Sequence, residues 1–228
     1  MEADSAISAD PALPGVVALP TVRSLPSGYR YGVTRYADVI LAQAFPSLFQ
    51  ELMRALYEFR IDYQKEIKIR GGARAKHTAR FDQFLHDQGW RKHNVRVEKR
   101  IDDQPIFKTP THEIDVFKLG EDGWYPGIAV EMEWNNKDPF FHRDLNNFSS
   151  LHSDGVIAVG VIVTRGPSLQ RRLEHCADAG EFAKSVYGRS STHWDKLVPI
   201  VNLGGGGQCP LVLVGIEPDR MVGWPNLD

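Results

Sequence analysis

Alternating apolar and polar residues predict two adjacent strands near the middle of the chain. Residues 111–117 (Thr-His-Glu-Ile-Asp-Val-Phe) and residues 129–134 (Ala-Val-Glu-Met-Glu-Trp) both follow a two-residue period. Between them lie residues 120–123, Gly-Glu-Asp-Gly, and polar segments bounded by glycine favour a hairpin turn. Because side chains alternate across a strand, we expect Glu131 and Glu133 on one face of the second strand and its apolar side chains on the other.

The spacing of apolar residues predicts helices and further strands elsewhere in the chain. Apolar residues three and four positions apart predict helices at residues 46–62, 81–85, 139–152 and 168–186. Continuous or alternating apolar runs predict strands at residues 94–101, 156–164, 197–201 and 211–216. Together these elements predict the α/β class, with a central mixed β-sheet flanked by helices.

Local details refine two of these helices. Ser47 and Gln50 have the spacing of a capping box at the start of the first helix. In the helix at 139–152, the apolar stripe begins at Phe141. We expect the polar neighbours Arg143 and Asp144 to face outward or across a subunit contact, so neither enters the predicted site.

The length of 228 residues is enough for one large hydrophobic core, and we expect residues 28–228 to form a single domain after a flexible leader at 1–27. The composition, 42% hydrophobic and 25% charged, is typical of a soluble globular protein. No apolar run approaches the roughly 18 residues of a membrane span, and the N-terminus lacks the pattern of a secretory signal. Cys176 and Cys209 form no C-x-x-C motif, so we expect a reducing cytoplasm and neither zinc nor disulfide chemistry.

Basic residues are concentrated in one part of a chain that is slightly acidic overall. The formal net charge is −2, yet residues 54–100 contain 13 Lys and Arg against 6 Asp and Glu. This asymmetry favours a basic strip that faces phosphates, although two solvated amphipathic helices have the same pattern. Gly71 and Gly72 either let the backbone approach a phosphate or form an exposed turn. The candidate phosphate contacts are Arg70, Arg74, Lys76 and Arg80.

The hairpin is also the candidate site of chemistry. If it brings Asp115 beside Glu131 and Glu133, three carboxylates converge at one point. Clustered carboxylates repel one another and raise one another's pKa unless a cation lies among them. Hard oxygen ligands of this kind suit Mg²⁺. The alternative is that Glu-x-Glu forms the solvated face of a half-covered sheet, which has the same alternation.

The sequence around these carboxylates resembles a known group of nucleases. Asp115, followed 16 residues later by Glu131 and then Glu133, resembles the PD-(D/E)xK nuclease core, with Glu133 in the place of the usual lysine. Glutamate at this third position is similar to what the BamHI-type enzymes have. Three segments resemble the BglII and BstYI type II restriction endonucleases, which have glutamine at the third position. These are residues 130–148, residues 159–165 and the Ser-Thr-His segment at 191–193, which precedes four consecutive glycines at 204–207. The resemblance extends over residues 45–217.

This resemblance implies a restriction-endonuclease-like core and a homodimer that cuts both strands of a short palindromic site in double-stranded DNA. The implied site has a GATC core, and the implied cofactor is Mg²⁺, with Mn²⁺ as a substitute. A prokaryotic, cytoplasmic enzyme is implied, with a companion DNA methyltransferase that is not physically bound, and no membrane partner.

Roles for individual residues follow from the resemblance. Asp115 would bridge the metal ions, and Glu131 would complete their coordination with the Met132 carbonyl oxygen. Glu98 would be an accessory ligand. Glu133 would orient or deprotonate the attacking water, or bind a second ion.

Base contacts are expected at two segments. Asn135 and Asn136 come directly after the acidic strand, and asparagine can pair bidentately with adenine. The second segment, assigned by resemblance only, contains Ser190, Ser191, Thr192 and His193. The alternative for both segments is that they consist of ordinary turn residues.

Two alternative functions remain open. One is a metal-dependent repair or structure-specific nuclease built on the same core. The other is a DNA-binding protein of nuclease ancestry that does not cleave. The complete set of three carboxylates favours cleavage, because a decayed site would be expected to lose one of them. A two-fold symmetric cut at one palindrome would separate the restriction enzyme from both alternatives.

Overall fold

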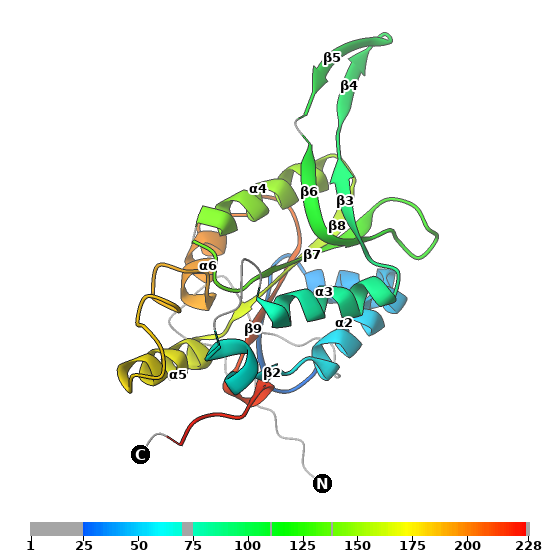
Figure 1. Cartoon of the computed structure of the whole chain (residues 1–228). Helices are drawn as coiled ribbons and strands as arrows, with labels where there is room; N and C mark the ends of the chain where they lie inside the picture. The colour runs from blue at the N-terminus through cyan, green and yellow to red at the C-terminus, as the bar shows by residue number, and fades with distance from the viewer. Residues whose placement is uncertain (1–24, 70–74, 110, 138, 227–228) are drawn as a thin grey trace.

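A mixed β-sheet with helices on both faces forms the centre of the protein (Figure 1). The computed structural model describes residues 25–69, 75–109, 111–137 and 139–226. The 6-stranded sheet has the order β1-β9-β8-β7-β6-β3. Strands β7, β8 and β9 are parallel, whereas β1, β6 and β3 pair antiparallel with their neighbours. The predicted α/β fold with a central mixed sheet is therefore confirmed.

The bounds of the elements are as follows. The strands are β1 (Tyr29–Val33), β2 (Ile61–Asp62), β3 (Arg91–Val95), β4 (Glu98–Ile101), β5 (Gln104–Lys108), β6 (His112–Lys118), β7 (Gly127–Glu133), β8 (Ile157–Arg165), β9 (Leu211–Ile216) and β10 (Met221–Val222). The helices are α1 (Ala37–Ala44), α2 (Pro46–Glu58), α3 (Lys76–Asp87), α4 (Pro139–Ser153), α5 (Pro167–Asp178) and α6 (Trp194–Asn202), with short turns η1 (Tyr63–Ile67) and η2 (Pro218–Arg220).

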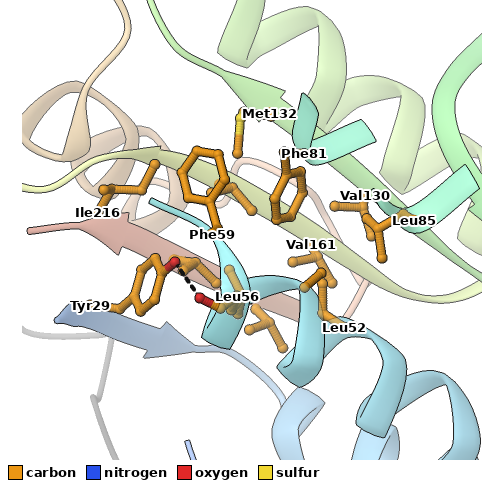
Figure 2. Packing of buried hydrophobic residues seen from close by; sticks show 14 of the residues in the cluster. Tyr29, Leu52, Leu56, Phe59, Phe81, Leu85, Val130, Met132, Val161 and Ile216 are labelled. Carbon is orange, nitrogen blue, oxygen red and sulfur yellow. Dashed lines mark hydrogen bonds between the residues drawn. The ribbon is translucent and has the colours of Figure 1, made fainter. Parts of the chain in front are cut away.

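Apolar side chains cover both faces of the sheet. On one face, Val130 and Met132 of β7 belong to a cluster with side chains from α1, α2, α3 and α5. Figure 2 shows the part of this cluster that α2 and α3 contribute. On the other face, Ala129 of β7 packs with α4 and α6. A Cβ atom at Gly160 of β8 would lie 2.3 Å from the Phe148 ring, so glycine is required for α4 to approach the sheet this closely. Helix α4 is thereby fixed next to the acidic strand.

Arg220 closes the C-terminal end of α2. Its Nη2 atom donates hydrogen bonds to the carbonyl oxygens of Leu56, Tyr57 and Phe59 at 2.7, 2.6 and 2.5 Å. Carbonyl groups at a helix C-terminus have no partner within the helix and need one from elsewhere. Tyr29 also donates to Leu56, at 2.7 Å, and so joins the first strand to the same helix end (Figure 2).

The structure corrects two predicted elements. Residues 197–201 lie within helix α6, not in a strand, because Trp194, Leu197 and Val201 follow the helical spacing and all are buried. No side-chain cap closes the N-terminus of α2, so the predicted capping box is wrong. The Ser47 backbone N–H instead donates to the Glu121 carboxylate at 2.7 Å.

The predicted strand at 94–101 is divided into two. Strand β3 ends at Val95, and β4 then pairs with β5 in a separate two-stranded sheet. This hairpin projects away from the body of the protein (Figure 1). Asp102 and Asp103 form its turn with positive φ angles of 44° and 62°. A two-residue turn with positive φ at both residues matches the right-handed twist of the two strands that it joins.

Candidate active site

The carboxylates of the predicted hairpin lie on neighbouring strands. Val116 of β6 is opposite Val130 of β7, and continuing this register places Asp115 beside Glu131. The Asp115 backbone N–H donates to Glu131 Oε1 at 3.1 Å. Because all residues of β7 are buried, Glu131 is not on a solvated sheet face. The interpretation of Glu-x-Glu as an ordinary exposed alternation is therefore wrong.

A fourth carboxylate, from helix α4, joins this group. Asp144 is only 2% exposed, and the same Arg143 nitrogen atom contacts both Asp144 and Glu133. The expectation that Asp144 faces outward is wrong, because it stands three residues after the buried Phe141 and so falls on the inner face of the helix. That spacing is the signal by which the sequence could have revealed it.

Arg143 lies beside the two buried carboxylates. Its Nε and Nη2 atoms are 2.8 and 2.7 Å from Asp144 Oδ1, and Nη2 is 3.6 Å from Glu133 Oε1. The guanidinium group is stacked over the Phe140 ring at 4.5 Å. One cation therefore contacts the acidic group directly.

Burial and mutual repulsion disfavour the charged forms of these carboxylates. Burial is the main cause that raises the pKa of Glu131 well above its usual value, and the charges of Asp144 and Asp115 raise it further. Burial also raises the pKa of Glu133 to about 8, with a further contribution from Asp144. Burial raises the pKa of Asp144, although Arg143 opposes the shift. A cation in this position would relieve the repulsion.

The acidic group opens into a cleft of about 790 Å³. Asp115, Glu131 and Glu133 line it, together with Met132 between the two glutamates. The cleft provides space for a polymer segment or a ligand at the end of β7. The cleft is also lined by polar side chains that could contact DNA, namely Lys76, Asn135, Asn136 and Arg143.

A family model described as "Restriction endonuclease BglII/BglIII" matches residues 29–216. The chain belongs to this family. The matched segment begins with the first residue of β1 and ends with the last residue of β9, so it includes the whole six-stranded sheet. The family is one of type II restriction endonucleases, which are site-specific deoxyribonucleases. A comparison with curated proteins finds no match.

The carboxylates of this restriction endonuclease fit a divalent metal ion by donor type, although their side chains do not converge on one point. Within the described ranges, no three His, Cys, Asp or Glu side chains are arranged to hold a metal ion. Glu131 and Glu133 each use one carboxylate oxygen in a hydrogen bond within the protein. In contrast, Asp144 Oδ2 is buried without a hydrogen-bond partner. Buried, mutually repelling oxygen donors are what a hard cation binds.

The two segments predicted to contact bases lie side by side. The Thr192 N–H donates to the Asn136 carbonyl oxygen at 2.8 Å, and the Asn136 N–H donates to Thr192 Oγ1 at 3.1 Å. Arg165, fully buried at the end of β8, donates to the Thr192 carbonyl oxygen and to Ser191 Oγ. Strand β8 therefore fixes both segments relative to the acidic strand.

Only some of these side chains are available to DNA. Asn135, Asn136 and Ser190 are exposed, whereas Thr192 and His193 are buried and hold the segment in place. Asn136 Nδ2 donates to Glu133 Oε2 at 2.6 Å. A candidate base-contacting residue is thus bonded to a candidate catalytic carboxylate, a link that sequence reasoning did not anticipate.

The remaining predicted residues lie in different places. Lys76 is exposed and lines the cleft, while Arg80 is bound to Glu66 and the Arg60 carbonyl oxygen at the surface. Glu98 lies in the projecting hairpin, 2.8 Å from Lys108, and does not line the cleft. The cause is the break after β3, which carries Glu98 away from the sheet. Arg70, Arg74, Gly71, Gly72 and most of the leader at 1–27 lie outside the described residues.

Proposed function

We propose that this restriction endonuclease uses Mg²⁺ to cleave both strands of a short palindromic DNA site with a GATC core, acting as a homodimer. The observation that supports the site of cleavage is the group of four buried or half-buried carboxylates beside the cleft. The family and the resemblance of residues 130–148 support the palindrome, the GATC core and the dimer. The proposal includes a prokaryotic cytoplasm and a methyltransferase that protects the host's own sites.

The reaction is hydrolysis of a phosphodiester. A water oxygen forms a bond to phosphorus, the bond from phosphorus to the leaving ester oxygen breaks, and a proton passes from the water to the leaving oxygen. When bound, Mg²⁺ supplies positive charge to the phosphate and lowers the pKa of water. Asp115, Glu131 and the Met132 carbonyl oxygen would hold the ion, and Glu133 would orient the water. Because Mn²⁺ also accepts oxygen ligands, we expect it to substitute.

Digestion of plasmid DNA tests this function. With Mg²⁺ we expect a small set of discrete fragments, and with EDTA we expect intact plasmid. A plasmid from which every GATC has been removed is the matched control and should resist cleavage. Degradation to a smear, or equal cleavage of both plasmids, would contradict the proposed specificity.

Lys76 and Asn136 should have separable roles in DNA binding, because one lines the cleft as a cation and the other as an amide. Lys76→Ala should weaken binding to cognate and random DNA alike and reduce the slope of log affinity against log salt by about one unit. Asn136→Ala should cost about 1–3 kcal/mol on the cognate site and little on random DNA. Salt titrations of affinity on both DNAs distinguish the patterns. Equal weakening of both DNAs by Asn136→Ala would show that it reads no base.

A further inference from the structure

Arg143 is held in a fixed orientation at the acidic site. Two of its nitrogen atoms lie 2.8 and 2.7 Å from the same oxygen of Asp144, and the Phe140 ring supports the plane of the guanidinium. Asp144 itself is buried at the inner face of α4. Such an arrangement restricts a long side chain that would otherwise sample many rotamers.

Only part of the Arg143 guanidinium group is used by the ion pair with Asp144. The Arg143 side chain is 54% exposed, whereas that of Asp144 is 2% exposed, so the outer donors of the guanidinium remain available to a ligand. The exposed part lies along the cleft wall, where DNA would enter. A guanidinium presents several donors in one plane and binds phosphate oxygens bidentately.

An entering phosphodiester meets several negative charges at this place. Asp115, Glu131 and Glu133 line the same cleft, and each repels the phosphate whenever its carboxyl group is ionised. The third position of the acidic strand holds Glu133, so the strand itself supplies no cation. Arg143, which contacts Glu133 from the following helix, is placed to supply the missing positive charge.

We propose that Arg143 is a further catalytic residue, whose guanidinium binds the non-bridging oxygens of the scissile phosphate and stabilises the charge that develops there during cleavage. Asp144 is its positioning residue. The inference rests on the proposed function and deepens it, because it names the group that contacts the reacting phosphate.

The test compares Arg143→Ala with wild type and with Arg171→Ala, an exposed arginine of α5 bonded to Ser168 and absent from the cleft wall. Single-turnover cleavage of a GATC-containing duplex is measured with Mg²⁺, and affinity for the same duplex is measured by fluorescence anisotropy in EDTA. We expect Arg143→Ala to slow cleavage by about 100-fold or more, as removal of a transition-state donor does, with affinity changed only a few-fold. Added guanidinium chloride should restore part of the rate, whereas equimolar NaCl should not.

If the melting temperature of Arg143→Ala lies well below that of the Arg171→Ala control, two further variants test the role of Arg143. Arg143→Lys retains the charge but not the planar donors, and we expect an intermediate rate. Asp144→Asn should also slow cleavage, and the double variant should be no slower than Arg143→Ala, since the two residues act together.

The possible outcomes distinguish a failure of the proposed function from a failure of the proposed role of Arg143. A wild-type protein that cleaves no duplex would refute the proposed function, and with it the role of Arg143. An active wild type with an equally active Arg143→Ala variant would refute only the role of Arg143. Parallel loss of affinity and rate, or equal rescue by NaCl, would also overturn it in favour of general charge attraction.

Discussion

Glu131→Gln and Asp115→Asn are each expected to reduce DNA cleavage by about three orders of magnitude or more while leaving specific DNA binding in place. Both substitutions keep the shape of the side chain and remove a carboxylate from the group that would hold the metal ion. Removing a carboxylate near phosphates relieves repulsion where that carboxylate is ionised and changes no charge where it is protonated, so binding in EDTA should be equal to or tighter than that of wild type. Cleavage rate and anisotropy on one duplex provide both quantities.

Glu98→Gln is the matched control for these two variants. Glu98 is an acidic residue of the same region of the sequence, but the structure places it in the projecting hairpin against Lys108. We therefore expect its cleavage rate to equal that of wild type. A loss of activity in Glu98→Gln, together with normal rates in Glu131→Gln, would show that the site has been assigned to the wrong carboxylates.

Arg220→Met is expected to lower the free energy of unfolding by about 3–5 kcal/mol, because it removes a buried guanidinium group and its hydrogen bonds to the carbonyl oxygens at the end of α2. Those oxygens keep the hydrogen bonds from Tyr29 and Arg60. Three carbonyl oxygens accept hydrogen bonds from Arg220 Nη2, and the residue is only 3% exposed. For a chain of this length the melting temperature should fall by about 6–20 °C. Urea unfolding followed by circular dichroism provides the measurement.

Arg171→Met is the control for this stability prediction, because Arg171 is exposed and, among the described residues, bonds only locally, to Ser168. Its free energy of unfolding should remain within about 0.5 kcal/mol of wild type. Equal stability of Arg220→Met and wild type would show that water replaces the guanidinium at the helix end without cost.

The hairpin at the centre of the site could be predicted from the sequence because it depends on local pattern. The two-residue period within 112–118 and 127–133 determines which side chains share a face, and the glycine-bounded polar connection between them indicates an antiparallel pair. The continuous apolar run that became β8 was equally informative. These features require no knowledge of distant contacts.

Other features depend on tertiary context. The apolar run at 197–201 suits a strand or a helix, and only packing against α4 and the sheet selects the helix. Glu98 could be placed only by knowing where β3 ends. Asp144 was missed because a polar residue was assumed to be exposed, although its position after Phe141 indicated the buried face.

The contact between Asn136 and Glu133 joins a residue proposed to read a base to a carboxylate proposed to act in cleavage. Asn136 Nδ2 donates one of its two hydrogens to Glu133 Oε2. This bond fixes the plane of the amide and leaves the second hydrogen and the Oδ1 acceptor for a base. Thr192 and Arg165 fix the backbone around Asn136, so the amide has few alternatives.

Sequencing the ends of DNA fragments after digestion with Mg²⁺ shows both the recognition site and the positions of the cuts. We predict that all ends map to one short palindrome containing GATC, with the two strands cut at positions related by its two-fold symmetry. Ends scattered over unrelated sequences, cuts in one strand only, or binding without any cuts would contradict the account.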